Sequence, residues 1–314
     1  MPEWLLERGI GESRAARLAD GAIIESRILL DGIVRTGTRL AARLKSVGPP
    51  AVAEAASQEY LLPKGADRVL EGAELVIAVT REAIPGAEPW KRPRAVVISD
   101  EPGAPDPIDA ELVSLPASTD RLGEAGWWDV IEEARSGIVR FAGGELRISP
   151  TAAMTLIDVD GHLPPQELAV AGAREAARAI LRLDIGGSIG IDLPTSGSKA
   201  ARQAAAVAID ELLPQPFERT AVNGFGFVQV VRPRLRASLV EVAQDRGAFE
   251  ARALLRCLAF DRPGGKRIIA HPAVVRVLEQ NRDWLDELAR QVGGPVELRA
   301  DAALPISGGY AESL

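Results

Sequence analysis

Two aspartates lie near the ends of two apolar segments in the second half of the chain. Asp158 is part of LIDVDGH and Asp192 is part of IGIDLPT, and the segments end at Gly161 and Pro194. A charge in a buried strand is costly unless it is paired or binds a metal. If the strands are neighbours, about 4.8 Å apart, both carboxylates reach one cation. Mg²⁺ takes one or two carboxylates together with water and phosphate oxygens, so the spacing permits one shared Mg²⁺.

Asp160 is a third carboxylate candidate. Side chains alternate between the two faces of a strand, so Asp160 shares a face with Asp158 and either adds a ligand or orients the others. In phosphodiester hydrolysis a metal polarises a phosphoryl oxygen and lowers the pKa of the attacking water, so no nucleophilic side chain is needed. Strand-end aspartates also cap helices or pair with arginines. The residues by themselves leave both interpretations open.

The elements that must position these aspartates alternate along the second half of the chain. We expect strands at TAAMTLIDVDG, SIGIDLPT and FGFVQVVRP, with helices at about 165–183 and about 199–213 between them. This alternation is typical of α/β packing. Upstream, WWDVIEEARSG predicts a short helix closed by Gly137, and IVRFAGGELRIS predicts a hairpin turned at Gly143 and Gly144.

The first hundred residues favour β-structure. WLLER, ESRAARLADG and AIIESRILL predict a meander of short strands, and residues 33–98 continue as short strands that fit a small barrel. The Pro-rich, acidic stretch at 100–120 predicts an extended connection. After Arg236 we expect ASLVEVAQ with EARALLRCLAF, and then PAVVRVLEQNRDWLDELARQV, to be helical, with KRIIAH as a strand between them.

The composition is that of a globular protein. The chain has 314 residues, of which 46% are apolar and 26% charged, so it can fold into about two domains. No apolar run approaches the roughly 20 residues that span a bilayer, and the start lacks a signal sequence, so we expect no membrane contact and a cytoplasmic protein. The net charge of −7 disfavours indiscriminate coating of nucleic acid but does not describe a local groove.

Several motifs occur in the order found in ribonucleases E and G. RSGIVRFAGGELRISPTAAMTLIDVDG resembles the family segment in which a basic hairpin leads into the first metal-binding aspartate. AREAARAILRLDIGGSIGIDLPT is similar to the helix, the Asp-(Leu/Ile)-Gly-Gly turn and the strand with the second aspartate. NGFGFVQVVRPRLRASL resembles the segment built on Ser-Arg-Phe-Gly, and the chain from residue 271 is similar to the family's small C-terminal domain. The resemblance is most specific over about 135–240.

The resemblance implies a metal-dependent endoribonuclease that cleaves single-stranded RNA, in RNA processing or decay, and leaves 5′-phosphate and 3′-hydroxyl ends. Asp158 and Asp192 would hold Mg²⁺, with Mn²⁺ as a possible substitute, and Asp160 would replace an Asn that orients the site. Basic residues that bracket this site would contact the RNA backbone: Lys199, Arg219, Arg232, Arg234 and Arg236.

The resemblance also implies a fold class, α/β combined with β. Residues 1–32 would form a β-rich segment that packs on the catalytic half, and residues 33–98 an OB-like RNA-binding barrel. Residues 99–134 would be a connection. Residues 135–240 would be a catalytic α/β domain of RNase H-like and DNase I-like character, and residues 241–314 a small α/β domain.

Besides Asp160, the chain departs from the family pattern at three places. Gly224 takes the position of the motif's Arg, a cation expected near the scissile phosphate, for which Arg219, Arg232 or Arg234 could substitute. Where the family has paired cysteines that form a zinc link between subunits, this chain has only Cys257, which we expect to be a small core residue. No zinc is therefore expected, and the protein would be a monomer or a homodimer without that link. The segment before the IVRF hairpin is too short for a sensor of 5′-monophosphate ends.

These departures leave other functions open. A catalytically degenerate relative would bind RNA or a partner protein without cleaving, as Gly224 and Asp160 would favour. A metal phosphoesterase that acts on small molecules would have a narrow closed pocket in place of an open groove.

Overall fold

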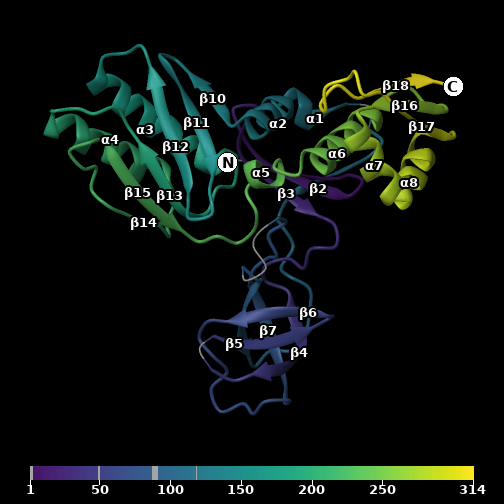
Figure 1. Ribbon diagram of the computed structural model, residues 1–314, viewed down its shortest axis with the longest axis horizontal. Coiled ribbons are helices and arrows are strands. Elements are labelled where there is room, and N and C mark those ends of the chain that lie inside the picture. Colours follow the sequence, from purple (N-terminus) through teal and green to yellow (C-terminus); the bar gives the residue numbers. More distant parts are fainter. Residues whose placement is uncertain (1–2, 49, 87–90, 118) are drawn as a thin grey trace.

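The computed structural model describes residues 3–48, 50–86, 91–117 and 119–314, which form a mixed α/β protein with three open sheets and one closed barrel. Figure 1 shows the barrel hanging below the rest of the molecule, the largest sheet at the left and the helical C-terminal part at the right. Within the described part of the chain, no helix combines the length and apolar character needed to cross a membrane.

The N-terminal sheet has the strand order β3-β2-β1-β9. Its members are β1 (Glu3–Arg8), β2 (Glu12–Ala19), β3 (Ala22–Leu30) and β9 (Glu111–Ser114). The first three form the antiparallel meander that the sequence predicts, whereas β9 pairs with β1 in parallel. The stretch at 100–120 is therefore more than an extended connection, since it adds an edge strand to this sheet.

The barrel lies in the chain between β3 and β9. It closes in the order β4-β5-β6-β8-β7, from β4 (Arg39–Ser46), β5 (Ala51–Ala55), β6 (Gln58–Leu62), β7 (Glu74–Arg81) and β8 (Arg94–Ile98). Leu44, Leu62 and Ile77 fill a core that is separate from the rest of the molecule. The structure thus confirms a small barrel within residues 33–98. It also shows, beyond the prediction, that the barrel is inserted between two strands of the N-terminal sheet.

The largest sheet has the order β10-β11-β12-β13-β15-β14. Its strands are β10 (Ile138–Phe141), β11 (Gly144–Pro150), β12 (Thr155–Gly161), β13 (Gly187–Asp192), β15 (Phe227–Arg232) and β14 (Glu218–Arg219). The neighbours β12 and β13 run parallel, and the other pairs are antiparallel. The alternation of strand and helix expected from the sequence is present.

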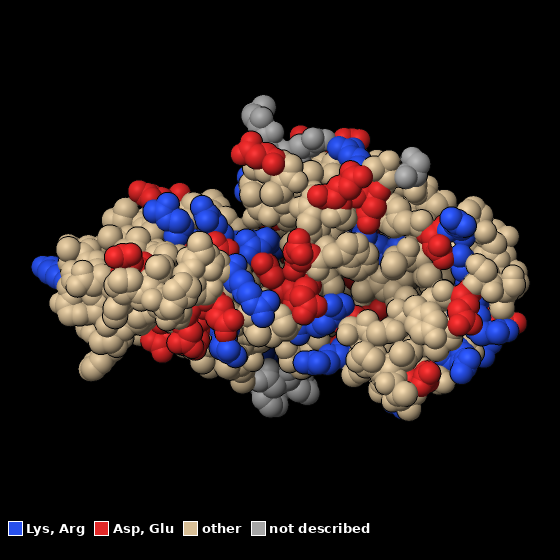
Figure 2. All heavy atoms as spheres, turned by 90° about the horizontal axis from the view of Figure 1, so that it is seen from above, with Lys and Arg blue, Asp and Glu red and all other residues tan. Residues whose placement is uncertain are grey.

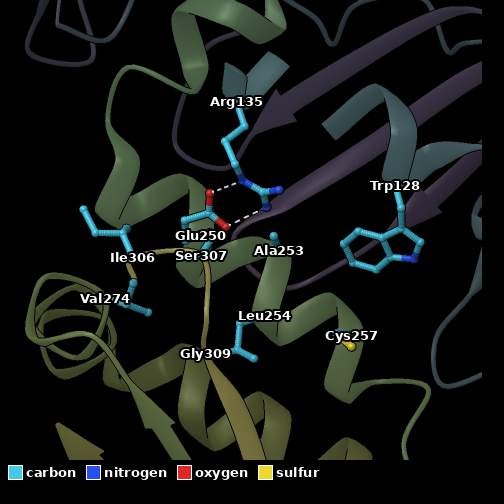
Figure 3. A pocket seen from close by; sticks show the side chains of 10 residues that line it. All are labelled: Trp128, Arg135, Glu250, Ala253, Leu254, Cys257, Val274, Ile306, Ser307 and Gly309. Atoms are coloured by element: carbon cyan, nitrogen blue, oxygen red, sulfur yellow. Dashed lines mark hydrogen bonds and ion pairs between the residues drawn. The ribbon is translucent and has the colours of Figure 1, made fainter. Parts of the chain in front are cut away.

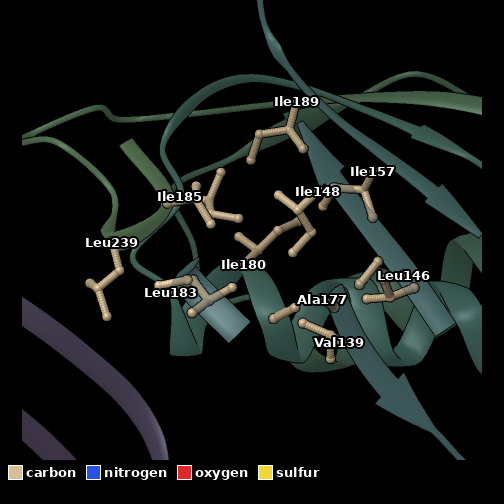
Figure 4. Packing of buried hydrophobic residues seen from close by; sticks show 14 of the residues in the cluster. Val139, Leu146, Ile148, Ile157, Ala177, Ile180, Leu183, Ile185, Ile189 and Leu239 are labelled. Carbon is tan, nitrogen blue, oxygen red and sulfur yellow. The ribbon is translucent and has the colours of Figure 1, made fainter. Parts of the chain in front are cut away.

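The helices α3 (Pro165–Arg182) and α4 (Lys199–Leu212) pack against each other and cover one face of this sheet. Gly172 brings α3 close to β12, because a Cβ there would lie 2.3 Å from Val159 Cγ1. Figure 4 shows Ile157 and Ile189 from the strands packed near Ala177 and Ile180 of α3. This core also includes buried residues of the N-terminal sheet.

The C-terminal part is built from helices on a small sheet. Its elements are α5 (Leu239–Val242), α6 (Arg246–Leu258), α7 (Pro272–Gln280), α8 (Arg282–Val292), β16 (Lys266–Ala270), β17 (Val296–Ala300) and β18 (Tyr310–Ser313). The predicted helix over 272–292 is wrong as one unit, because Asn281 has a non-helical ψ of 66° and separates α7 from α8. The strands β17 and β18, which flank β16, were not predicted.

Two short helices lead from β9 into the largest sheet. They are α1 (Arg121–Glu124) and α2 (Trp127–Ser136), and Gly137 ends α2 in the left-handed conformation with φ of 71°. Trp127 is fully buried and packs α2 into the main core. The predicted hairpin follows directly as β10 and β11.

A buried ion-pair network joins the N-terminal sheet to α6. Glu7 accepts hydrogen bonds from Arg14 at 2.9 Å and from Arg256 at 2.8 and 2.9 Å. Glu12 pairs with Arg14 and Arg252, each at 2.8 Å. All five side chains are buried, so the network fixes β1 and β2 against a helix that is more than two hundred residues away in sequence.

The segment after β7 ties the barrel to the chain that leaves β15. The backbone N–H of Glu82 donates to the carbonyl of Leu235 at 2.8 Å, and Thr36 Oγ1 donates to the same carbonyl at 2.9 Å. Arg236 pairs with Glu82 at 3.5 Å and with Asp184 at 3.0 Å. These contacts hold the top of the barrel beside the largest sheet.

Candidate active site

Asp158 and Asp192 lie directly opposite each other on the adjacent parallel strands β12 and β13. Neighbouring strands are about 4.8 Å apart, so the two carboxylates can reach one cation. Ile157 and Ile191, the preceding residue in each strand, are fully buried beneath the helices. The aspartates therefore project from the other face, where both are exposed.

Negative charge accumulates at this point of the sheet. The pKa of Asp158 is raised, first by burial and then by the charges of Asp160 and Asp192, while Arg147 acts in the opposite direction. Among the residues that the structure describes, neither Asp158 nor Asp192 forms an ion pair with a basic side chain. The carboxylates therefore lack the arginine partners that they would have if their role were to form structural ion pairs.

Asp160 follows on the same exposed face, two residues along β12, and lies opposite Glu145 of β11. Two residues of strand correspond to about 7 Å, which places Asp160 beside the pair rather than between its members. The described residues contain no group of three or more His, Cys, Asp or Glu side chains arranged to hold a metal. A two-carboxylate site, completed by water and phosphate oxygens, is the arrangement that Mg²⁺ commonly uses.

Arg147 is a basic residue at the site that sequence reasoning did not single out. It lies opposite Asp158 in the register of β11 and β12, and its Nη2 pairs with Glu145 at 2.6 Å. The sequence feature that could have located Arg147 is the short loop at 151–154 between the two strands. The Thr151 N–H closes this loop by donating to the Met154 carbonyl at 3.0 Å. Such a tight loop fixes the register of the two strands and with it the position of Arg147.

A loop that precedes β15 packs against the chain just after Asp192. A Cβ at Gly226, where φ is 98°, would lie 2.1 Å from the Leu193 carbonyl oxygen, so only glycine fits there. Thr195 Oγ1 donates to the Phe225 carbonyl at 2.9 Å. The loop thereby presents Phe225, whose side chain is 80% exposed, close to the end of β13.

Gly224 lies in the same loop, and a Cβ built there would meet no atom within 4 Å. The loop therefore has room for a side chain at the position where the resemblance leads us to expect an arginine. Asn223 shapes the loop instead, since its Oδ1 accepts from the N–H groups of Phe225 at 2.9 Å and Phe227 at 3.1 Å.

Two of the arginines expected near the carboxylates form ion pairs elsewhere in the structure. Arg219 lies opposite the buried Val230, on the helix-covered face, and pairs with Asp210 of α4. Arg236 pairs with Glu82 and Asp184. Arg219 is therefore not a substitute for the missing arginine at the site, because the sheet itself separates it from Asp158 and Asp192.

The remaining expected RNA contacts differ in position. Arg232 is also on the helix-covered side, where its Nη1 donates to the Ile185 carbonyl at 3.3 Å and burial lowers the pKa of its guanidinium. Arg234 pairs with Glu241. Lys199 is the exposed first residue of α4, close in sequence to Asp192, and forms no ion pair within the described part of the chain.

A cavity of about 270 Å³ lies away from the carboxylates, between α2, α6 and the loop before β18. Figure 3 shows Arg135 and Glu250 joined by two hydrogen bonds at its edge, with Cys257 and Trp128 nearby. Cys257 is exposed here, so its expected place in the core is wrong. Although the residue is exposed at the surface, partial burial of its sulfur raises the pKa of the thiol, which disfavours the reactive thiolate.

Comparison with known proteins adds no family to this picture: no family model matches the chain, and no curated protein matches it. The exposed carboxylate pair and its surroundings are therefore the basis on which a function can be assigned. The chemistry of that donor set, two adjacent carboxylates with a third beside them, fits a hard divalent cation.

Proposed function

We propose that the protein is a Mg²⁺-dependent endoribonuclease that hydrolyses phosphodiester bonds of single-stranded RNA. The observation that carries the proposal is the registered pair Asp158 and Asp192 on an exposed sheet face. Because this face is open, it favours an extended polymer over a small molecule, which a narrow pocket would enclose. The products would have 5′-phosphate and 3′-hydroxyl ends, as the resemblance to ribonucleases E and G implies.

Features around the pair support a single-stranded substrate. The exposed ring of Phe225 can stack on a base, and stacking accepts any base because each has a π-face. The barrel, with five strands, matches the architecture of OB folds, which bind oligonucleotides. Figure 2 shows basic and acidic side chains interspersed on the face of the molecule seen from above, so that face carries no uniform basic coat.

The chain's own residues would divide the work. Asp158 and Asp192 would hold the cation, which when bound polarises the phosphodiester and lowers the pKa of the attacking water. Asp160 would accept hydrogen bonds from water beside the pair and thereby orient it. Arg147, opposite Asp158, would attract the phosphate and stabilise the charge that develops on it, in the role expected of the arginine absent at Gly224.

The finer assignments belong to the same proposal. We infer that residues 135–240 form a catalytic domain of RNase H-like and DNase I-like character, related to ribonucleases E and G, and that the barrel is OB-like. The protein would act on RNA in the cytoplasm without zinc.

A cleavage assay with paired variants tests the proposal. Purified protein should cut a fluorogenic single-stranded RNA in Mg²⁺ or Mn²⁺, and Asp158→Asn or Asp192→Asn should lower kcat/KM at least about a hundredfold. Asp286→Asn, which changes an exposed aspartate in α8, is the matched control and should retain activity. Unchanged cleavage in both site variants would refute the assignment of Asp158 and Asp192.

A second candidate function is RNA binding without cleavage. The open space at Gly224 favours it, because no cationic side chain extends from that loop toward the scissile phosphate. Retention of RNA with no turnover in Mg²⁺ and Mn²⁺ would support this candidate, whereas a cut that depends on Asp158 would dismiss it.

A further inference from the structure

A cleft of about 880 Å³ lies between the barrel and the largest sheet. Its barrel wall contains Arg81, the last residue of β7, and Arg94, the first residue of β8. Its other wall contains Ser188 of β13 and Arg234, which follows β15. The carboxylate pair does not line this cleft, so any ligand here binds at a second place.

Arg81 and Arg94 bring like charges together. They lie opposite each other in the antiparallel pair of β7 and β8, an arrangement that is destabilising without a counter-charge. Arg81 is only 9% exposed, and its Nε has no hydrogen-bond partner among the described residues. Its Nη2 donates to the backbone carbonyl of Arg92, and within the described part of the chain Arg81 forms no ion pair with a carboxylate.

The opposite wall adds a third guanidinium. Two glycines allow it to approach: a Cβ at Gly187 would lie 3.2 Å from Arg234 Cδ, and one at Gly186 would lie 2.7 Å from the Pro233 carbonyl oxygen. Arg234 pairs with Glu241, but its buried Nε is also without a partner in the described structure. The pKa of Arg81 is lowered to about 10, mainly by burial and then by the charges of Arg94 and Arg234.

The charge balance of the lining therefore calls for an anion. Four arginines line the cleft, namely Arg81, Arg94, Arg232 and Arg234, and of the described lining residues Glu218 alone is acidic. Arg234 also has a partner outside the lining, Glu241, so the excess of positive charge is carried mainly by Arg81 and Arg94. A buried donor without a partner is costly, and a phosphate supplies several acceptor oxygens together with negative charge. Arginine is the side chain best suited to bind it with two parallel hydrogen bonds.

We propose that this arginine cleft, defined by Arg81, Arg94 and Arg234, binds an internucleotide phosphate of the single-stranded RNA whose scissile bond lies at Asp158 and Asp192. The inference rests on the proposed function and adds to it a second anchor for the substrate. The fold would then fix the distance between the phosphate bound in the arginine cleft and the bond that is cleaved.

The open sheet face connects the two places. Ser188 in the cleft and Asp192 are four residues apart on the same face of β13, about 13 Å. Between them Gly190 has no side chain, and Phe227, Leu156 and Met154 surround the space above it. An RNA strand anchored in the arginine cleft would cross this apolar floor and reach the carboxylates at its far end.

A binding experiment without metal tests the cleft independently of cleavage. Fluorescein-labelled oligouridylate of about ten nucleotides, with a 5′-hydroxyl end, is titrated in EDTA at several salt concentrations. Arg94→Gln should weaken binding about tenfold and lower the slope of log K against log salt by about 0.7. Arg276→Gln, which changes an exposed arginine of α7 away from both the barrel and the cleft, is the matched control.

Two further readouts keep the result interpretable. Inorganic phosphate should compete with the oligonucleotide on the wild-type protein and less well on Arg94→Gln. Arg81→Gln changes a buried residue, so its circular dichroism must match wild type before its weaker binding counts as support. Unchanged affinity and salt slope in Arg94→Gln would overturn the proposal.

Substrates of different length distinguish the loss of an anchoring contact from a general loss of activity. Arg94→Gln should lower kcat/KM for the longer oligonucleotide and leave it unchanged for a dinucleotide, which is too short to reach the arginine cleft. An equal loss on both substrates would contradict an anchoring role. If the wild-type protein cleaves neither substrate, the proposed nuclease function fails, while the binding experiment still decides whether the cleft holds a phosphate.

Discussion

Replacing Glu7 by Gln should destabilise the protein strongly, although the change removes only a charge. Glu7 is 1% exposed and receives one hydrogen bond from Arg14 and two from Arg256. Breaking a buried ion pair from one side costs about 3–5 kcal/mol, because a buried charge is left without its partner. Arg14 retains Glu12 and Arg256 retains Asp120, so we expect the lower end, about 3 kcal/mol.

The free energy of unfolding can be measured by urea titration, followed by tryptophan fluorescence, since Trp127 is fully buried in the main core. Glu124→Gln, an exposed glutamate of α1, is the control and should change stability by less than about 0.5 kcal/mol. Combining Glu7→Gln with Arg14→Met should cost less than the sum of the two single variants, because the residues share one network. A loss below about 1 kcal/mol for Glu7→Gln, with an unchanged m-value, would refute this reasoning.

Two predictions concern the candidate active site. Phe225→Ala should weaken binding of single-stranded RNA by about 1–3 kcal/mol per stacked base, measured by fluorescence anisotropy. Tyr310→Ala, which removes an aromatic side chain that is 46% exposed on β18, is the control and should not weaken it. Equal effects of the two variants would argue against stacking. Only the ionised carboxylate binds a cation, and the pKa of Asp158 is raised. Mg²⁺ affinity, measured by calorimetry, should therefore be lost on acidification at a higher pH than it would be for an aspartate with the ordinary pKa. Asp160→Asn removes one cause of that raised pKa and should move the loss to lower pH; an unmoved midpoint would contradict the coupling.

The second half of the chain shows what a sequence can predict. Local signals locate α3 and α4 within a residue of their ends, because Pro165 begins one helix and Ser198 caps the other. The alternation of apolar residues in LIDVDGH and IGIDLPT shows that Asp158 and Asp192 leave the core on one face. Their position as direct neighbours required only that β12 and β13 be adjacent and parallel.

The missed features depend on distant partners. The strand β9 has four residues in a Pro-rich stretch, and only its pairing with β1 makes it a strand. Arg219 shares a strand edge with the exposed Glu218 but points to the other face, which a two-residue strand does not reveal by periodicity. The arginine cleft joins residues more than a hundred positions apart, so no local spacing could indicate it.

The insertion of the barrel between β3 and β9 sets the order in which the protein can fold during synthesis. Strands β1 to β3 leave the ribosome first, yet their sheet is incomplete until β9 follows, and the buried charges of Glu7 and Arg14 wait for Arg256 on α6. The barrel has its own core and contacts between nearby residues, so it can form in the meantime. The N-terminal strands therefore complete their sheet and their buried ion pairs only after β9 and α6 have been made.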